Sequence, residues 1–323
     1  MKYPNLNLTL SSSPHAHSKN STAIIMRDVC IALIPALVAA IWFFGIRALT
    51  MTVISCIFCV IFEWAYRTLM KKDQTICDWS AVVTGMLVAF VCPSNLPMWT
   101  LIVGDFFAIV VVKQLFGGIG MNIVNPALAA RAFMFSWPSL MSGNWPSPTV
   151  DGQTCATPMA SLAEGALPAE SLLDLFLGKV GGSFGEVSAL ALIIGGIYLL
   201  ARKVISARIP LAYILTVAVL AFAFPVGGNA RLDWMLYQLL SGGLMLGAIF
   251  MATDYTTSPV THGGQIAFGI GCGVLTVALR YFGSYPEGVS YAILIMNCCV
   301  GFFDKIGIPK RFGLKKKRGG ETK

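Results

Sequence analysis

Long apolar runs dominate this chain and leave it few ways to fold. Ten stretches of mostly apolar residues are separated by charged residues or by breaks rich in Gly and Pro. Apolar residues make up 56% of the 323 residues and charged residues only 12%, whereas a soluble domain has about 45–50% apolar and about 25% charged residues. The sequence therefore excludes a soluble enzyme, a disordered chain and a fibrous repeat. It predicts an all-α polytopic membrane protein.

The ten apolar runs predict ten transmembrane helices. A helix needs about 20 residues to cross about 30 Å of hydrocarbon, and ten helices with their connections fit this chain with one long loop left over. Several of the runs are shorter than a full span. The expected helices lie near residues 28–46, 50–69, 79–92, 99–116, 126–139, 187–201, 209–225, 237–252, 266–283 and 289–304.

The basic residues predict the orientation of these helices. With the N-terminus in the cytoplasm, 18 Lys and Arg residues fall on the cytoplasmic side and only four on the outer side, as the positive-inside rule requires. An even number of spans also keeps the strongly basic C-terminal tail inside. We therefore expect a cytoplasmic segment 1–27, five helices within 28–139, an extracytoplasmic loop 140–186, five helices within 187–304, and a cytoplasmic tail 305–323.

A weak internal repeat relates the two five-helix halves. Residues 84–87 open a short apolar run that ends at residues 92–97, and residues 241–244 open another that ends at residues 254–259. Each run is the third span of its half, and halves with five spans have opposite topology, as in inverted-repeat transporters with broken helices. Chance similarity between apolar stretches is the alternative. The repeat predicts a ligand site between the two halves.

The long outer loop contains a stretch of small and polar residues that suits covalent modification. Residues 151–157 read Asp-Gly-Gln-Thr-Cys-Ala-Thr, and a proline follows. A loop of small residues with an exposed hydroxyl can enter the active site of a modifying enzyme, where the Thr oxygen can be esterified. The alternative is an ordinary polar loop.

This stretch resembles the flavinylation motif D-x-x-[S/T]-G-A-[S/T], whose last hydroxyl is joined to the phosphate of FMN by a flavin transferase. Thr157 occupies the last position, and Asp151, Thr154 and Ala156 match the motif upstream. Cys155 departs from the usual Gly, which in the motif eases bending of the backbone.

Further blocks are similar to one family, which comprises the D subunits of Rnf complexes and the B subunits of sodium-pumping NADH:quinone oxidoreductases. These blocks are residues 117–128, 250–259 and 285–289, and residues 12–15 are similar to the Rnf branch. The resemblance runs from the N-terminus to about residue 304. The short length of the chain also favours the Rnf branch.

The resemblance implies a multi-pass membrane subunit of an ion-translocating ferredoxin:NAD oxidoreductase in the bacterial cell (inner) membrane, a translocase that is not catalytic alone. It implies FMN held covalently on Thr157, electrons passing to or from partner subunits, and coupling to Na⁺ or H⁺ translocation. It also suggests a second, noncovalent flavin, riboflavin, within the bundle. The expected partners are the A, B, C, E and G subunits of the Rnf complex, the flavin transferase and the lipid bilayer, without nucleic acid. Flavin transfer takes place outside the cytoplasm, where the charge distribution independently places Thr157.

Three polar residues near the centre of the chain are candidates for contacts with the second flavin. Asn122 and Asn125 can hydrogen-bond the edge of an isoalloxazine, and Arg131 can stabilise a reduced, anionic flavin. Gly117, Gly118 and Gly120 let the backbone bend before the next helix. The alternative is that both Asn side chains cap the ends of broken helices.

Three residues are candidates for an ion path. Asp254 follows an apolar run and precedes Thr257, and an acid with hydroxyls at a broken helix can bind a cation or relay a proton. The alternative is a capping or loop acid. Asp105 lies within an apolar run, and an acid inside the membrane is a functional candidate by default. Glu63 lies four residues before Arg67, and we expect a plain ion pair on one helix there.

Two spacings that are typical of metal sites are not interpreted as such. Cys56 and Cys59 lie in an apolar span without a second Cys pair, whereas a cluster normally needs four thiolates. His15 and His17 lie in a polar tail, and His262 is the only other histidine. No metal, NADH site or catalytic triad is expected. Two other classes of function stay open, a solute channel or secondary transporter of inverted-repeat fold and a structural scaffold for redox subunits, and bound flavin distinguishes both from an electron carrier.

Overall fold

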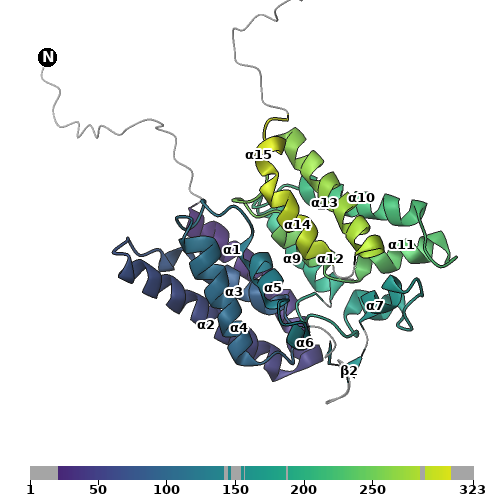
Figure 1. The fold of residues 1–323 in the computed structure, drawn as a ribbon, viewed down its shortest axis with the longest axis horizontal. Coiled ribbons are helices and arrows are strands. Elements are labelled where there is room, and N and C mark those ends of the chain that lie inside the picture. The colour runs from purple at the N-terminus through teal and green to yellow at the C-terminus, as the bar shows by residue number, and fades with distance from the viewer. Residues whose placement is uncertain are drawn as a thin grey trace, which may run out of the picture.

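Helices form nearly all of the regular structure. The computed structural model describes residues 21–141, 145–146, 154–155, 157–186, 188–283 and 288–306. The first half contains α1 (Thr22–Phe44), α2 (Ile46–Leu69), the short 3₁₀ helix η1 (Ile76–Asp78), α3 (Ser80–Phe90), α4 (Met98–Phe106), the π-helix η2 (Phe107–Gln114) and α5 (Pro126–Met134). Figure 1 shows these elements as one group on the left.

The second half forms a second group of helices on the right of Figure 1. It contains α9 (Ala189–Ala201), α10 (Arg208–Ala223), α11 (Arg231–Leu240), α12 (Leu244–Leu246), the π-helix η3 (Gly247–Met251), α13 (His262–Phe282), α14 (Val289–Cys298) and α15 (Val300–Phe303).

Every sequence range that we expected to be helical contains a helix. Among the described residues, α1, α2 and α13 are by themselves long and apolar enough to cross a membrane. The bent pair formed by α11 with α12 and η3 adds a fourth crossing if it is counted as one span. The fold is thus that of a multi-pass, helical membrane protein.

Local sequence signals explain where several helices begin. Ser21, Ser188 and Thr261 precede α1, α9 and α13, and each side-chain oxygen accepts a hydrogen bond from a backbone N–H in the first turn. This satisfies donors that have no partner within the helix. Gly45 separates α1 from α2 at a φ of 72°, a conformation that an L-residue with a side chain rarely adopts.

The long connection between the halves contains short helices and a pair of short strands, whereas the sequence led us to expect a loop. It contains α6 (Pro138–Met141), the antiparallel pair β1 (Trp145–Pro146) and β2 (Thr154–Cys155), α7 (Pro158–Ala163) and α8 (Leu172–Leu177). Proline occupies the first position of α6 and α7, where its missing N–H costs nothing. Asp151 and Ala156 of the candidate modification motif lie outside the described residues, as do 1–20 and 307–323.

The helical stretch formed by α11, α12 and η3 is bent at a break. α11 and the segment α12–η3 meet at an angle of 63°, and Gly242 and Gly243 at the break have φ values of 68° and 67°. Arg280 of α13 donates hydrogen bonds to the carbonyl oxygens of Gln238 (2.6 Å) and Ser241 (3.0 Å) at the end of α11. A break inside a membrane protein is tolerated because such partners satisfy the freed backbone groups.

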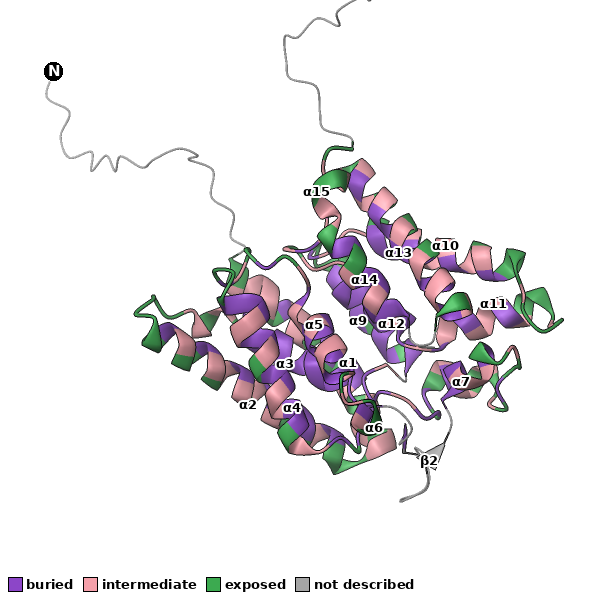
Figure 2. Ribbon diagram, in the orientation of Figure 1, coloured by how far each residue is buried: buried purple, intermediate pink, exposed green. Residues whose placement is uncertain are grey.

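The two halves pack on each other through α1 and α9. Figure 2 shows buried residues concentrated where the two groups of helices meet, with exposed and intermediate residues along their outer faces. Exposed side chains on these faces include Trp42 (84%), Val219 (64%) and Phe282 (89%). Large apolar side chains on the outside of a helical bundle suit a lipid environment.

Replacing Gly195 by Ala tests the packing of α1 on α9. A Cβ at Gly195 would overlap the carbonyl oxygen of Ala32, which belongs to the backbone and has no rotamer to turn aside. We expect Gly195→Ala to destabilise the protein by about 1–3 kcal/mol, as overpacking does, and to lower the melting temperature in detergent. Gly301→Ala is the matched control, because nothing lies within 4 Å of a Cβ there. Equal melting temperatures for both variants would contradict this packing.

Candidate functional site

A cavity lies between the two halves where several helices begin or end. Its volume is about 80 Å³, which is room for several water molecules. The lining comes from α1, from the start of α3 and α5, and from the ends of η2, α9 and η3. Lys113, Asn122, Asn125 and Asp254 are among the polar lining residues, while most of the wall is apolar. Apolar walls with a few polar groups are typical of cofactor sites.

The two candidate asparagines lie at this cavity but have different partners. Asn125 caps α5, because its Oδ1 accepts hydrogen bonds from the backbone N–H groups of Ala127 (3.0 Å) and Leu128 (3.4 Å). Its Nδ2 donates to the carbonyl oxygen of Met251 in the other half (3.3 Å). The capping interpretation is therefore confirmed for Asn125.

Asn122 joins the two sequence blocks on either side of the cavity. Its Nδ2 donates to Thr256 Oγ1 at 2.9 Å, across 134 residues of sequence, and to the carbonyl oxygen of Val124 at 3.2 Å. Among the described residues its Oδ1 accepts no hydrogen bond, so this oxygen is available to a ligand. Asn122 thus keeps an acceptor for the cavity.

The candidate acid Asp254 belongs to the same hydrogen-bonded group. Its Oδ2 accepts from Thr256 Oγ1 (2.9 Å) and Thr257 Oγ1 (3.2 Å). Burial raises the pKa of Asp254, and the two threonine hydrogen bonds and the charge of Lys113 oppose that effect. The structure therefore brings Asn122, Asn125 and Asp254 together at one cavity.

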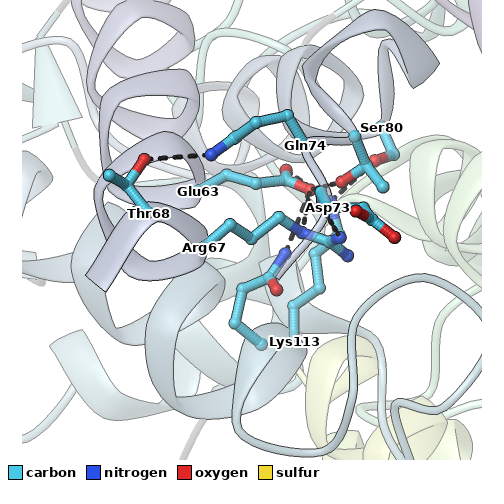
Figure 3. Close-up of polar contacts among 9 residues, drawn as sticks. Glu63, Arg67, Thr68, Asp73, Gln74, Ser80 and Lys113 are labelled. Carbon is cyan, nitrogen blue, oxygen red and sulfur yellow. Dashed lines mark hydrogen bonds and ion pairs between the residues drawn. The ribbon is translucent and has the colours of Figure 1, made fainter. Parts of the chain in front are cut away.

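Lys113 is a lining residue that the sequence interpretation did not single out. Its Nζ lies 2.9 Å from Glu63 Oε2 and 2.7 Å from Ser80 Oγ, and its side chain is 4% exposed. Figure 3 shows Glu63, Arg67 and Lys113 meeting beside the segment that carries Asp73 and Ser80. The only signal in the sequence was a lysine at the end of an apolar run.

Glu63 has more partners than the expected pair on one helix. The contact with Arg67 exists, at 3.8 Å, but Lys113 is closer. Glu63 Oε1 also accepts hydrogen bonds from Thr75 (2.7 Å) and Gln114 (3.0 Å). The acid thus joins α2 to η2 and to the connection before α3.

Thr157 lies at a second, smaller pocket of about 30 Å³. It precedes α7, is 7% exposed, and its side chain makes no capping hydrogen bond. The same pocket is lined by Ser183 and by residues 240–243 at the break between α11 and α12. Ser241 Oγ is buried there without a hydrogen-bond partner among the described residues. Of Thr154 only the strand position is described.

Arg131 does not line the cavity. It forms a buried ion pair with Glu186, which lines the pocket of Thr157. Arg131 and Asn125 both belong to the α5 segment, but they face different sites. The structure therefore separates Arg131 from the two asparagines with which the sequence grouped it.

Two helices connect the cavity with the pocket. α3 begins with Ser80 at the cavity and ends at Phe90, whose carbonyl oxygen accepts a hydrogen bond from Gly185 N beside the pocket. Its 11 residues span about 15 Å at 1.5 Å per residue. α5 follows Asn125 at the cavity and carries Arg131, whose ion-pair partner Glu186 lines the pocket. The two sites thus lie about one short helix apart.

Asp105 lies inside the first half, away from both sites. Its Oδ1 accepts hydrogen bonds from Ser55 Oγ (2.6 Å) and Cys59 Sγ (3.4 Å), while Oδ2 has no partner among the described residues. Cys56 Sγ instead donates to the carbonyl oxygen of Val82 at 3.6 Å. No group of residues suited to a metal ion occurs in the described part of the chain.

Comparison with known proteins gives matches along the whole chain. A family model described as "NQR2, RnfD, RnfE family" matches residues 9–313, so the match extends into the basic tail. The D subunit of the Na(+)-translocating ferredoxin:NAD(+) oxidoreductase complex of Acetobacterium woodii is 50% identical over 317 residues, 96% of this chain and 97% of the relative.

Two further relatives have similar names. The D subunit of the proton-translocating ferredoxin:NAD(+) oxidoreductase complex of Clostridium ljungdahlii is 39% identical over 327 residues, 95% of this chain and 97% of the relative. The D subunit of the ion-translocating oxidoreductase complex of Stutzerimonas stutzeri is 35% identical over 331 residues, 91% of this chain and 93% of the relative.

Variants of Asn125 test its role as a cap. Asn125→Ala removes the acceptor for two backbone N–H groups, and we expect it to cost about 1 kcal/mol of stability. Asn125→Ser keeps a capping oxygen and should melt close to the unmodified protein. The melting temperature of each variant in detergent checks this. An Asn125→Ala variant as stable as Asn125→Ser would show that the cap contributes nothing.

Proposed function

The chain belongs to the NQR2, RnfD, RnfE family, and we propose that it is the membrane subunit of an ion-translocating ferredoxin:NAD oxidoreductase complex that carries electrons through bound flavin. Similarity along the full chain to D subunits of complexes named for that activity carries the proposal. The partners are then the A, B, C, E and G subunits of the complex and the flavin transferase that modifies the chain.

The proposed topology has ten spans in two inverted halves, with both termini in the cytoplasm. Helices at all ten expected ranges and a broken third span in the second half support it. The cytoplasmic ends of the helices then surround the cavity, and the pocket of Thr157 lies on the outer side. A flavin transferase acting outside the cytoplasm would reach the chain on that side.

Thr157 is the proposed attachment point for FMN. The residues at its pocket fit a phosphoryl linkage, because Ser241 has a buried hydroxyl without a partner among the described residues and Gly181, Gly182 and Gly242 leave the backbone accessible. Ser241 would donate a hydrogen bond to a phosphate oxygen, and the Thr157 oxygen would carry the ester. FMN, when bound, supplies one- and two-electron exchange.

The cavity between the halves is the proposed site of the noncovalent flavin, riboflavin. A flavin has an apolar ring system with hydrogen-bonding groups at one edge, and the cavity offers apolar walls beside Asn122, Thr84 and Lys113. The donor and acceptor set therefore fits this group. The half-exposed Tyr255 lines the same cavity and adds an aromatic ring to its wall.

The ion path is proposed to involve Asp254, Thr257 and Asp105. Asp254 and Thr257 lie at the cavity end of the broken span and share a hydrogen bond. Asp105 has an unpartnered carboxylate oxygen among the described residues. The complexes of two relatives are named for Na⁺ and for protons, so the assay of the ion path follows both ions.

Variants of Thr157 test the covalent flavin. Because the ester needs the hydroxyl, we expect Thr157→Ala to abolish FMN on the peptide that contains residue 157 and to stop electron transfer through the complex, with the bundle still folded. Thr157→Ser keeps a hydroxyl and should be modified. Thr149→Ala in the same segment is the control and should carry FMN. Peptide mass spectrometry after co-expression with the flavin transferase reads the result, and FMN retained in Thr157→Ala would refute the assignment.

Variants of Asp254 test the ion path. Asp254→Asn removes the charge but keeps the shape, so we expect ion uptake per electron to fall while the FMN content stays unchanged. The assay follows Na⁺ and H⁺ uptake by vesicles that contain the complex during ferredoxin-driven NAD reduction. Asp73→Asn is the control, because Asp73 is exposed and only its backbone oxygen contacts Arg67. Undiminished uptake in Asp254→Asn would exclude Asp254 from the path.

A further inference from the structure

A buried ammonium group, that of Lys113, lies at the wall of the cavity, and the proposed function assigns no role to its charge. We propose that Lys113 is the cation that contacts the noncovalent flavin and raises its redox potential, and that Glu63 is the positioning residue that holds Lys113 in place. This role rests on the proposed flavin site in the cavity, and the redox titration distinguishes a failure of Lys113 from a failure of that site.

The contacts of Lys113 leave one donor for a ligand. A lysine ammonium has three N–H donors, and among the described residues Nζ contacts only Glu63 Oε2 (2.9 Å) and Ser80 Oγ (2.7 Å). Lys113 and Ser80 both line the cavity, whereas Glu63 lies behind them. The third N–H is therefore available to a ligand in the cavity.

Glu63 and its neighbours hold the Lys113 side chain in place. Each oxygen of Glu63 has a partner, because Oε1 accepts from Thr75 and Gln114 while Oε2 faces Lys113. Arg67 adds a second cation at 3.8 Å, so the cluster carries one positive charge more than it carries negative charges. A buried charge is tolerated when it is paired and its partner is fully hydrogen-bonded.

The same cluster fixes the loop that leads to Asn122. The carbonyl oxygen of Lys113 accepts a hydrogen bond from Gly118 N at 2.9 Å. Gly118 has a φ of 98°, and a Cβ there would lie 2.7 Å from Arg67 Nη2. The ammonium and the asparagine amide are thus held relative to each other by one set of contacts, which suits a site that binds one rigid ring.

The charge of Lys113 has a direct consequence for a redox group. A flavin that accepts an electron from a partner subunit without a proton becomes more negative by one charge, and a cation within hydrogen-bonding distance stabilises that form more than the oxidised one. The effect is large where water is excluded, because the interaction of two charges grows as the local dielectric constant falls. The sequence suggested Arg131 for this role, but Arg131 pairs with Glu186 at the other pocket.

The experiment is a redox titration of the full-length chain purified in detergent, in a Thr157→Ala background, so that the noncovalent flavin is the only one. We expect Lys113→Met to retain flavin and to bind the reduced form about tenfold less favourably relative to the oxidised form, which lowers the midpoint potential by about 59 mV for a one-electron couple. Lys113→Arg should stay near the parent. Lys72→Met is the control. It removes an exposed lysine just after the C-terminal end of α2, the end that carries Glu63 and Arg67, and should not change the potential.

A second variant covers the case in which Lys113→Met does not fold. The double variant Glu63→Gln with Lys113→Met removes both charges of the pair and should also lower the potential, because the cation is nearer to the cavity than the acid. Flavin lost from Lys113→Met but kept by Lys113→Arg would equally support a direct contact of the cation with the flavin.

Three results would overturn the role of Lys113. An unchanged potential in Lys113→Met or in the double variant would show that Lys113 does not act on the flavin. Loss of flavin from Lys113→Met and Lys113→Arg alike would show a purely structural role. A parent chain that holds no acid-extractable flavin would refute the flavin site itself, and the role of Lys113 with it.

Discussion

One hydrogen bond joins the irregular segment before α5 to the irregular segment after η3, and the proposed sites depend on this contact. Asn122 Nδ2 contacts Thr256 Oγ1 across 134 residues of sequence, and Thr256 in turn donates to Asp254. Each of these residues lies in irregular backbone next to a helix end. Irregular backbone within a membrane is tolerated only where it is buried in protein or lines a cavity. The segments before α5 and after η3 supply hydrogen-bond partners to each other, and the cavity lies where they meet.

A buried ion pair lies near each end of α3. Near its start, Lys113 pairs with Glu63, and near its end Arg131 pairs with Glu186. A buried ion pair contributes little net stability, but a buried charge without its partner is strongly destabilising. One residue of each pair lines a proposed flavin site, Lys113 the cavity and Glu186 the pocket of Thr157. These pairs are therefore better understood as fixing charge beside a ligand than as holding the helices together.

Much of the fold could be predicted from the sequence, because apolar runs and capping residues act locally. The ten ranges contain helices, and Ser21 and Thr261 cap helices. The helices α7 and α8 were missed although Pro158 and Ser171 are ordinary start signals, because a polar, Gly-rich segment was interpreted as loop. The partners of Lys113 and Arg131 could not be predicted, since residues about 50 positions apart meet only through tertiary packing. The motif singled out Thr157 as a candidate for modification. The sequence did not predict that Thr157 would be buried at a pocket.

The proposed function requires two kinds of flavin on one chain, one covalent at Thr157 and one noncovalent in the cavity between the halves. The most direct test is to purify the full-length chain after co-expression with the flavin transferase and to precipitate it with acid. We expect FMN to stay with the precipitated chain and riboflavin to appear in the supernatant, in equal amounts. A colourless protein that yields neither flavin would contradict this function and would favour a channel or transporter.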